Sequence, residues 1–264
     1  PAAGACRREK IPRRLQRKSL MPRSPQEPEF NGALLIDKPA GPTSHDIVDI
    51  VRLLYGIKKV GHCGTLDPAA TGLLILLLGR ATKLSQKLTT EDKIYEGSLE
   101  LGKSTDSYDA QGAVTATAAV PVLDCDALNA AAKEYTGDIQ QQPPMVSAVK
   151  KDGVPLYKLA RKGKTVEREA KPVHIYSYEF SEYTEPVGHF RVHCTKGTYV
   201  RSLAHDLGQS LGCGAHLRTL HRTASGKFEV KDAIRLEELV KLPDDELPRR
   251  LVSLLELVQL LQPE

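Results

Sequence analysis

The sequence predicts a mixed α/β protein of the α+β class, built as one large domain with short appendages. Three observations predict this fold. Residues 73–78 are apolar at every position, which is typical of a strand buried on both faces. Residues 93–101 alternate apolar and polar side chains, as in a strand with one buried face. Apolar residues recur at helical spacing from residue 200 to residue 211. The chain has 264 residues, 41% of them hydrophobic, which suffices for a sizeable core.

The first elements follow a basic N-terminal segment. Residues 33–36 (ALLI) are expected to form a short strand, and residues 37–44 (DKPAGPTS) a turn. Ser44 is the expected N-cap of a helix that ends at Gly56, because serine oxygens cap helices and glycine commonly ends them. The apolar face of this helix consists of Ile47, Ile50, Val51 and Leu54.

The next elements surround the apolar run. Residues 80–88 (RATKLSQKL) are expected to be helical. In residues 93–101 the alternation places Tyr95 on the inward face, together with Leu99 and Leu101. Without further information, Tyr95 is interpreted as a core aromatic residue.

The C-terminal half contains another strand and helix in succession. Residues 189–194 (HFRVHC) alternate like a strand, and residues 195–197 (TKG) turn the chain into the helix that starts near Val200. Arg201 falls in the first turn of this helix, close to a strand end. The helix dipole disfavours a cation there, so we expect Arg201 to have an acidic partner.

Residues 61–72 (GHCGTLDPAATG) are expected to form an ordered loop with a single carboxylate. Its glycines allow backbone angles closed to other residues, and Pro68 restricts the chain directly after Asp67. Taken alone, this composition fits an ordinary turn in which Asp67 caps the backbone.

The positive charge of the chain is concentrated in two segments. Residues 1–29 hold eight Lys or Arg against three Glu and lack apolar periodicity, so we expect a disordered basic leader. Met21 is a candidate start, and a transit peptide is the alternative. Residues 150–171 also carry eight Lys or Arg, against three Asp or Glu. This block fits a surface that contacts phosphates, although a solvated basic face has the same composition.

Several classes of protein are disfavoured. No apolar run approaches the roughly 18 residues that span a bilayer, so we expect a cytoplasmic protein without membrane contact. The five cysteines show no disulfide framework or zinc spacing. No phosphate-binding loop or dinucleotide fingerprint occurs. Residues 208–212 (GQSLG) match a nucleophile elbow, but a helical stripe runs through them where that motif requires a strand.

Five blocks, in order and at similar spacing, resemble the TruB family of tRNA pseudouridine synthases between about residues 31 and 240. They are GHCGTLDPAATGLL, TKLSQKL, DKIYEGSLELGKSTDSYDAQG, PPMVSAVKKDGVPLYKLARKG and CTKGTYVRSLAHDLGQSLGCGAHLRTLHR. The resemblance implies the pseudouridine synthase core, a mixed sheet flanked by helices. It also implies that the T-loop uridine of tRNA is the substrate, with no metal or organic cofactor.

The resemblance implies a role for three catalytic residues. Asp67 corresponds to the nucleophilic aspartate; whether it attacks the sugar C1′, attacks the base C6 or acts as a base stays open. Arg201 would pair with Asp67 and lower the pKa of its carboxyl. Tyr95 would stack on the target base and take part in proton removal.

Further residues would bind the RNA by the same resemblance. His62 would fill the space left by the extruded uridine, Lys83 would lie near Asp67, and Tyr199 would contact the base. Residues 143–171 match a thumb-like insertion that grips the T-arm of the tRNA. Its basic residues include Lys150, Lys151, Lys158, Arg161 and Lys162.

The expected domain organisation differs from that of bacterial relatives at the C-terminus. Residues 30–240 would form the catalytic domain and residues 241–264 a helical tail, too short for the PUA domain that usually follows. We expect a monomer acting on tRNA. Two alternatives are an RNA-folding factor on the same scaffold and a guide-RNA-dependent rRNA pseudouridine synthase.

Overall fold

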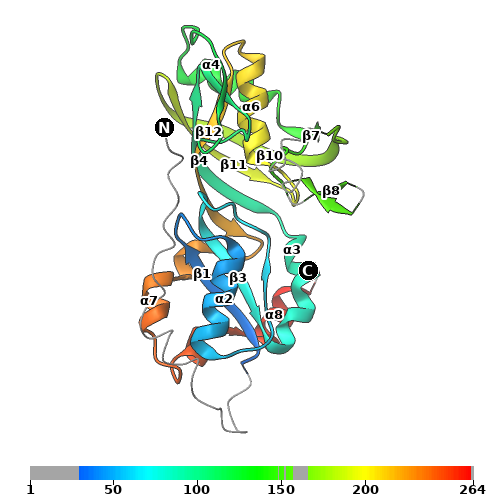
Figure 1. Cartoon of the computed structure of the whole chain (residues 1–264), viewed down its shortest axis with the longest axis vertical. Coiled ribbons are helices and arrows are strands. Elements are labelled where there is room, and N and C mark those ends of the chain that lie inside the picture. Colours follow the sequence, from blue (N-terminus) through cyan, green and yellow to red (C-terminus); the bar gives the residue numbers. More distant parts are fainter. Residues whose placement is uncertain (1–29, 148, 152, 157–165, 263–264) are drawn as a thin grey trace.

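The computed structural model describes residues 30–147, 149–151, 153–156 and 166–262. A mixed sheet of 11 strands runs through these residues (Figure 1). Its main path is β14-β1-β3-β12-β4-β11-β10-β7, and β2, β13 and β15 pair at its sides. The α+β class predicted from the sequence is confirmed.

One part of the sheet is centred on β1 (Gly32–Lys38) and β3 (Thr71–Leu78), which pair antiparallel. All of β3 from Leu73 to Leu78 is buried, as its apolar run predicted. Around β1 and β3 lie the shorter strands β2 (Val60–Cys63), β13 (Phe228–Glu229), β14 (Ile234–Arg235) and β15 (Leu251–Ser253).

The helix α2 (Ser44–Tyr55) covers this part of the sheet and ends at Gly56, as expected. Its N-cap is Thr43, whose hydroxyl accepts from the backbone N–H of Asp46 in a capping box. The expected cap at Ser44 is therefore wrong by one residue. The reason is tertiary, because the Ser44 hydroxyl is bonded to Leu66 of a distant loop.

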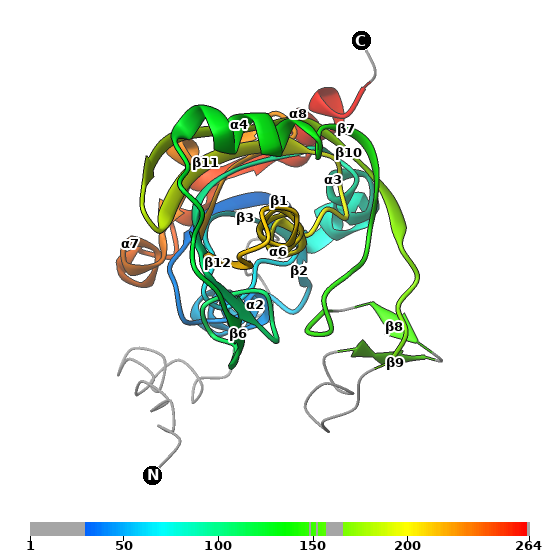
Figure 2. The ribbon, with the colours of Figure 1, turned by 90° about the horizontal axis from the view of Figure 1, so that it is seen from above.

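The other part of the sheet curves around α6 (Val200–Ser210), which lies inside the curve when seen from above (Figure 2). Apolar residues of α6 that the periodicity predicted, including Leu203, Ala204 and Leu207, are fully buried. The strands of this part are β4 (Lys93–Leu101), β7 (Gly137–Gln141), β10 (Lys171–Thr184), β11 (Val187–Cys194) and β12 (Ala215–Ser225). The helix α4 (Cys125–Lys133) packs against β10.

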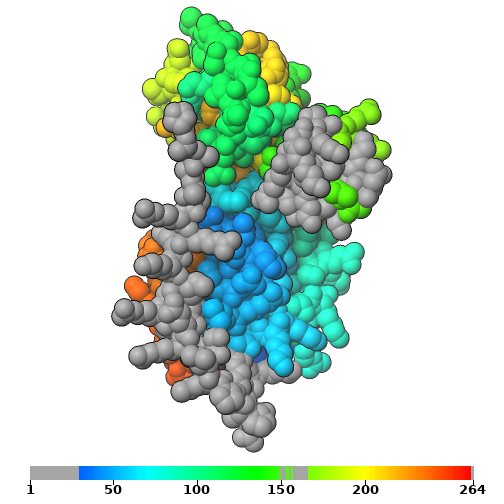
Figure 3. Space-filling view, viewed as in Figure 1, coloured from blue at the N-terminus to red at the C-terminus, as the bar shows by residue number. Residues whose placement is uncertain are grey.

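The two parts meet where β12 passes from β4 to β3. It pairs with β4 along most of its length, but with β3 only at His221↔Thr71 and Arg222↔Gly72. Gly72 has a φ of 96°, and a Cβ there would collide with the carbonyl oxygen of Arg222. Glycine is required at this close approach of two backbones. In the space-filling view, the two parts form a blue-to-cyan and a green-to-yellow body (Figure 3).

Two segments differ in detail from the expectation. Residues 80–88, expected to be one helix, contain η1 (Gly79–Leu84) followed by α3 (Ser85–Thr89). The C-terminal tail contains α8 (Leu254–Leu260), but also β15, which extends the sheet. The remaining short elements are β5 (Lys103–Thr105), β6 (Val114–Thr117), β8 (Lys150–Lys151), β9 (Val154–Pro155), η2 (Val230–Asp232), α7 (Leu236–Lys241) and η3 (Leu247–Arg250). No helix among the described residues is both long and apolar enough to cross a membrane.

Candidate active site

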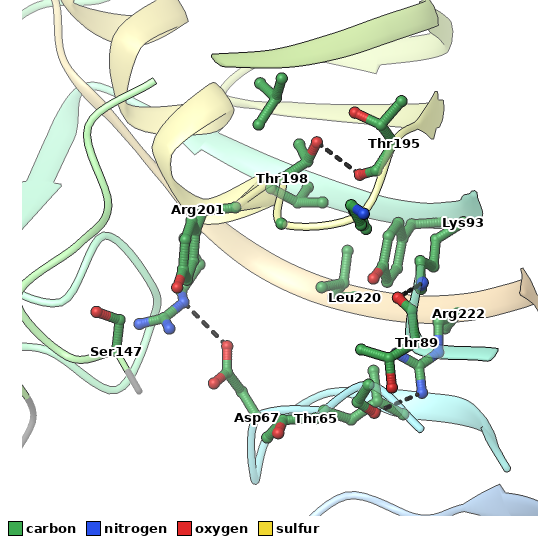
Figure 4. A pocket seen from close by; sticks show the side chains of 18 of the residues that line it. Thr65, Asp67, Thr89, Lys93, Ser147, Thr195, Thr198, Arg201, Leu220 and Arg222 are labelled. Atoms are coloured by element: carbon green, nitrogen blue, oxygen red, sulfur yellow. Dashed lines mark hydrogen bonds and ion pairs between the residues drawn. The ribbon is translucent and has the colours of Figure 1, made fainter. Parts of the chain in front are cut away.

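A pocket of about 600 Å³ opens at the junction of the two parts of the sheet. Eight segments line it: the loop between β2 and β3, the end of α3, the start of β4, the loop at Ser147, the start of β10, the turn before α6, the first turn of α6, and β12. Its polar lining residues include Thr65, Asp67, Thr89, Lys93, Tyr95, Ser147, Lys171, Thr195, Lys196, Thr198, Tyr199, Arg201 and Arg222 (Figure 4).

Asp67 and Arg201 form an ion pair on the wall of this pocket. The Nε of Arg201 lies 3.0 Å from Oδ2 of Asp67. The Asp67 side chain is 43% exposed, whereas that of Arg201 is only 5% exposed. Arg201 therefore has the acidic partner that its position at the start of α6 predicted.

Arg201 is held by further contacts on its other nitrogens. It donates to the carbonyl of Ser107 at 3.1 Å and to that of Val146 at 2.8 Å. A second carboxylate, Asp109, lies 3.5 Å away. No local pattern places Asp109 in the site, because an aspartate in a turn rich in Ser, Asp and Gly has an ordinary local role there.

The pKa of Asp67 shifts in the opposite direction from that expected from Arg201 alone. Burial in the pocket raises the pKa of its carboxyl above the ordinary value. Arg201 and Lys38 lower this pKa, as expected of nearby cations, and the Asp109 carboxylate raises it further. Desolvation outweighs the two cations, so the net shift is upward.

Tyr95 lies on β4 and lines the same pocket, with 9% of its surface exposed. Burial raises the pKa of its hydroxyl, while the charge of Arg222 opposes this shift. The inward orientation predicted from the alternation of β4 is confirmed. Its catalytic role stays a prediction.

Two buried polar side chains hold the loop that carries Asp67. The Lys38 ammonium donates to the carbonyls of Pro68 at 3.2 Å and Ala70 at 2.8 Å. The Ser44 hydroxyl accepts from the N–H of Leu66 and donates to its carbonyl. Burial lowers the pKa of Lys38 to about 8. The loop is thus fixed immediately before and after Asp67.

Neither of these residues was predicted from the sequence to belong to the site. Lys38 and Ser44 occupy a segment interpreted only as a turn and a helix cap. Their bonds reach 22 to 32 residues along the chain, and no local pattern signals such contacts.

The residues predicted to bind RNA are placed differently from one another. Tyr199 lines the pocket, where its backbone N–H donates to Gln141 at 2.7 Å. His62 lies on β2, outside the pocket lining, and burial lowers the pKa of its imidazole. Lys83 is exposed on η1, beyond the end of β3 that is distant from Asp67. The structure does not bring Lys83 into the pocket.

Lys93 occupies the pocket instead. It is 5% exposed and donates to the backbone carbonyls of Thr89 and Glu91. Burial lowers the pKa of its ammonium to about 8.

The basic block is only partly described. Lys150 and Lys151 form β8, which pairs with β9 in a hairpin that projects from the body (Figure 2). Lys158, Arg161 and Lys162 lie outside the described residues. At the pocket itself, the exposed cations of the lining are Lys171 and Lys196. Among described residues, no cluster of three His, Cys, Asp or Glu side chains could hold a metal ion.

A mixed sheet of this topology, with an Asp–Arg pair beside a buried tyrosine at its centre, defines a pseudouridine synthase. Residues 52–200 match the profile of the TruB family pseudouridylate synthase (N terminal domain). Residues 201–263 match that of the tRNA pseudouridylate synthase B C-terminal domain. The chain belongs to the TruB family, which confirms the resemblance noted in the sequence.

Relatives and solved structures agree with this assignment. The tRNA pseudouridine synthase B of Opitutus terrae is 54% identical over 85% of this chain and 93% of its own length. That of Syntrophotalea carbinolica is 46% identical over 86% of this chain and 74% of its own. A solved Cbf5-Nop10-Gar1 complex contains a chain with a TM-score of 0.67 and 29% identity. The match covers 87% of this chain and 62% of that one.

Proposed function

We propose that this protein isomerises a uridine in the T loop of tRNA to pseudouridine, with Asp67 as the catalytic carboxylate. The observation that carries the proposal is the Asp67–Arg201 ion pair, which lies in a pocket that Tyr95 also lines. The names of the relatives, tRNA pseudouridine synthase B, support tRNA as the substrate.

The reaction replaces the bond that joins the uracil base to the ribose. The bond between C1′ and N1 breaks, a bond between C1′ and C5 forms, C5 loses its proton and N1 gains one. Asp67 supplies the carboxylate that attacks or stabilises positive charge and then leaves. Arg201 orients that carboxylate, and Tyr95 takes part in removing the proton from C5.

The pocket supports an extruded nucleotide as its occupant. Its volume of about 600 Å³ falls within the range of small-molecule sites, about 300–1,000 Å³. A base inside the folded T loop cannot reach Asp67, so it must leave its stack at a cost of a few kcal/mol. His62 would help fill the vacated space, and Tyr199 would contact the base.

The rest of the T-arm would bind outside the pocket. Lys171 and Lys196 at the pocket and the basic residues of segment 143–171, which include Lys150 and Lys151, would neutralise phosphates. The proposal includes action as a monomer, without a cofactor, in the cytoplasm where tRNA is found.

The test is to incubate the pure protein with a T-arm hairpin, without guide RNA, and to map pseudouridine by mass spectrometry after chemical labelling. We expect modification at a single T-loop uridine. Tight binding without product would favour the RNA-folding factor. Product only after addition of a guide RNA would favour the guide-dependent alternative.

A further inference from the structure

Arg222 is the most unusual buried group near the pocket. It heads the largest fully buried side chains of the described residues, with 1% of its surface exposed. It lies on β12 at the point where this strand joins the two parts of the sheet. Figure 4 shows Arg222 between Lys93 and the loop of Thr65 and Asp67.

Arg222 connects three segments of the chain through its guanidinium and its strand pairing. Its Nε donates to the carbonyl of Leu73 on β3 at 2.7 Å. Its Nη2 donates to the carbonyl of Gly64 at 3.1 Å, three residues before Asp67. Tyr95 is the direct cross-strand partner of Arg222 on β4, and both residues line the pocket. Arg222 thus lies beside Tyr95 while it binds the loop that carries Asp67.

The charge of Arg222 is as informative as its geometry. No carboxylate among the described residues forms an ion pair with it, so the acceptors of this buried cation are the backbone carbonyls of Leu73 and Gly64. Burying an unpaired charge is costly, and a neutral donor would brace the loop at lower cost. The charge also lowers the pKa of Lys93, and it favours the ionised form of the Tyr95 phenol.

We propose that Arg222 is a positioning residue for the isomerisation, which holds Tyr95 and the Asp67 loop at a fixed separation. Its planar fork sets the geometry, and its positive charge stabilises the phenolate form of Tyr95, which is the form that can accept the proton from C5. The expected effect of Arg222 on the reaction rate rests on the proposed function, whereas its coupling to Tyr95 does not.

The kinetic test uses Arg222→Lys, which keeps the charge and removes the fork. At saturating T-arm hairpin, the single-turnover rate should fall about tenfold to 100-fold, because a small misplacement of reacting groups is costly. The Kd for the hairpin should change less than about threefold, since Arg222 is only 1% exposed and most of the T-arm would bind outside the pocket. Arg191→Lys on β11, at an exposed arginine paired with Glu96, is the matched control and should keep the wild-type rate.

A second measurement is independent of activity. The changes in Tm caused by Arg222→Lys and Tyr95→Phe should not add, because the two side chains are direct cross-strand neighbours. Arg222→Lys combined with Tyr135→Phe is the control. The Tyr135 hydroxyl donates to the backbone carbonyl of Asp206 rather than to a partner of Arg222, so the two changes in Tm should add.

Each contrary outcome overturns the inference. A wild-type single-turnover rate in Arg222→Lys would show that the fork positions nothing. Additive Tm changes would show that Arg222 and Tyr95 are not linked. Arg222→Lys without a cooperative unfolding transition would show that the whole fold, rather than the site, requires the residue. If the wild-type protein makes no pseudouridine, the proposed function fails. The Tm comparison still tests whether Arg222 and Tyr95 are energetically coupled.

Discussion

The Asp67 side chain is partly exposed, and its neighbours have opposing effects on the pKa of its carboxyl group. Burial and Asp109 raise this pKa, and Arg201 and Lys38 lower it. The ion pair with Arg201 fixes the direction of the carboxylate, and the 43% exposed side chain stays accessible to a substrate. The site thus orients the Asp67 carboxyl group and leaves it open to a substrate.

Asp67→Asn should abolish product formation, because an amide cannot supply the carboxylate that the rearrangement needs. Binding of the T-arm hairpin should stay within about tenfold, or about 1.4 kcal/mol. Pseudouridine mapping and a filter-binding titration measure the two effects. Asp49→Asn, at an exposed aspartate on α2, is the control and should leave both unchanged. Turnover by Asp67→Asn would remove Asp67 from the mechanism.

The acid limb of the pH–rate profile should report the charge of Asp67. Because the active form is ionised and its pKa is raised, the rate should rise with pH through a midpoint above 3.8. Asp109→Asn removes a nearby negative charge, which makes ionisation of Asp67 easier and should shift this midpoint to lower pH. Asp106→Asn, in the same turn, should leave the midpoint in place. A midpoint that Asp109→Asn moves upward would contradict this assignment of the limb.

At the level of elements, the loop between β2 and β3 is rigid because separate elements satisfy its carbonyls. Lys38 at the end of β1 binds Pro68 and Ala70, and Ser44 at the start of α2 binds Leu66. The loop backbone also accepts from Gly41, whose N–H lies 2.8 Å from the Pro68 carbonyl. A catalytic group on a loop gains precision when the loop is held this way.

Lys38→Met should destabilise the protein by about 1–3 kcal/mol at pH 7, because buried loop carbonyls lose their donor. At this pH, below its pKa of about 8, the Lys38 side chain is still largely charged. Urea unfolding should show a lower midpoint with an unchanged slope. Lys103→Met, which removes only an exposed ion pair with Glu100, should cost at most about 1 kcal/mol. Equal effects of the two variants would mean that Lys38 does not brace the loop.

For the whole molecule, affinity for RNA should depend on where the cations lie rather than on the net charge of +4. The formal charges of residues 30–264 sum to about −1, so the net charge of these residues does not attract RNA. Lys171 and Lys196 at the pocket are the described cations best placed to meet its phosphates.

Replacing Lys171 and Lys196 with Ala should weaken T-arm binding and reduce the slope of log K against log salt by about 0.7 to 0.9 for each lost contact. Arg161→Ala with Lys162→Ala should have the same effect if the basic block grips the RNA as the sequence predicts. Lys241→Ala on α7 is the control. The single-turnover rate at saturating RNA should change little in the Arg161 and Lys162 pair. An unchanged salt slope would mean that the block is a solvated face.

Local patterns predicted the elements of this fold better than the contacts that complete its site. The alternation of β4 placed Tyr95 inward, and the stripe on α6 placed Arg201 at its first turn, because both depend on neighbours a few residues away. Lys38, Asp109 and Arg222 were missed as members of the site. Their partners lie far along the chain, and a buried cation bound to backbone carbonyls has no sequence pattern of its own.

The two sides of β1 are completed by segments made at very different times. β3 covers one side soon after β1 is synthesised, whereas β14 and β15 cover the other side only when residues 234–253 have been made. Until then, a growing chain carries an open strand edge with Leu34 and Ile36, whose side chains are fully buried in the finished protein. An open apolar edge invites pairing with other chains, so the nascent protein is most prone to aggregate before its C-terminal strands leave the ribosome.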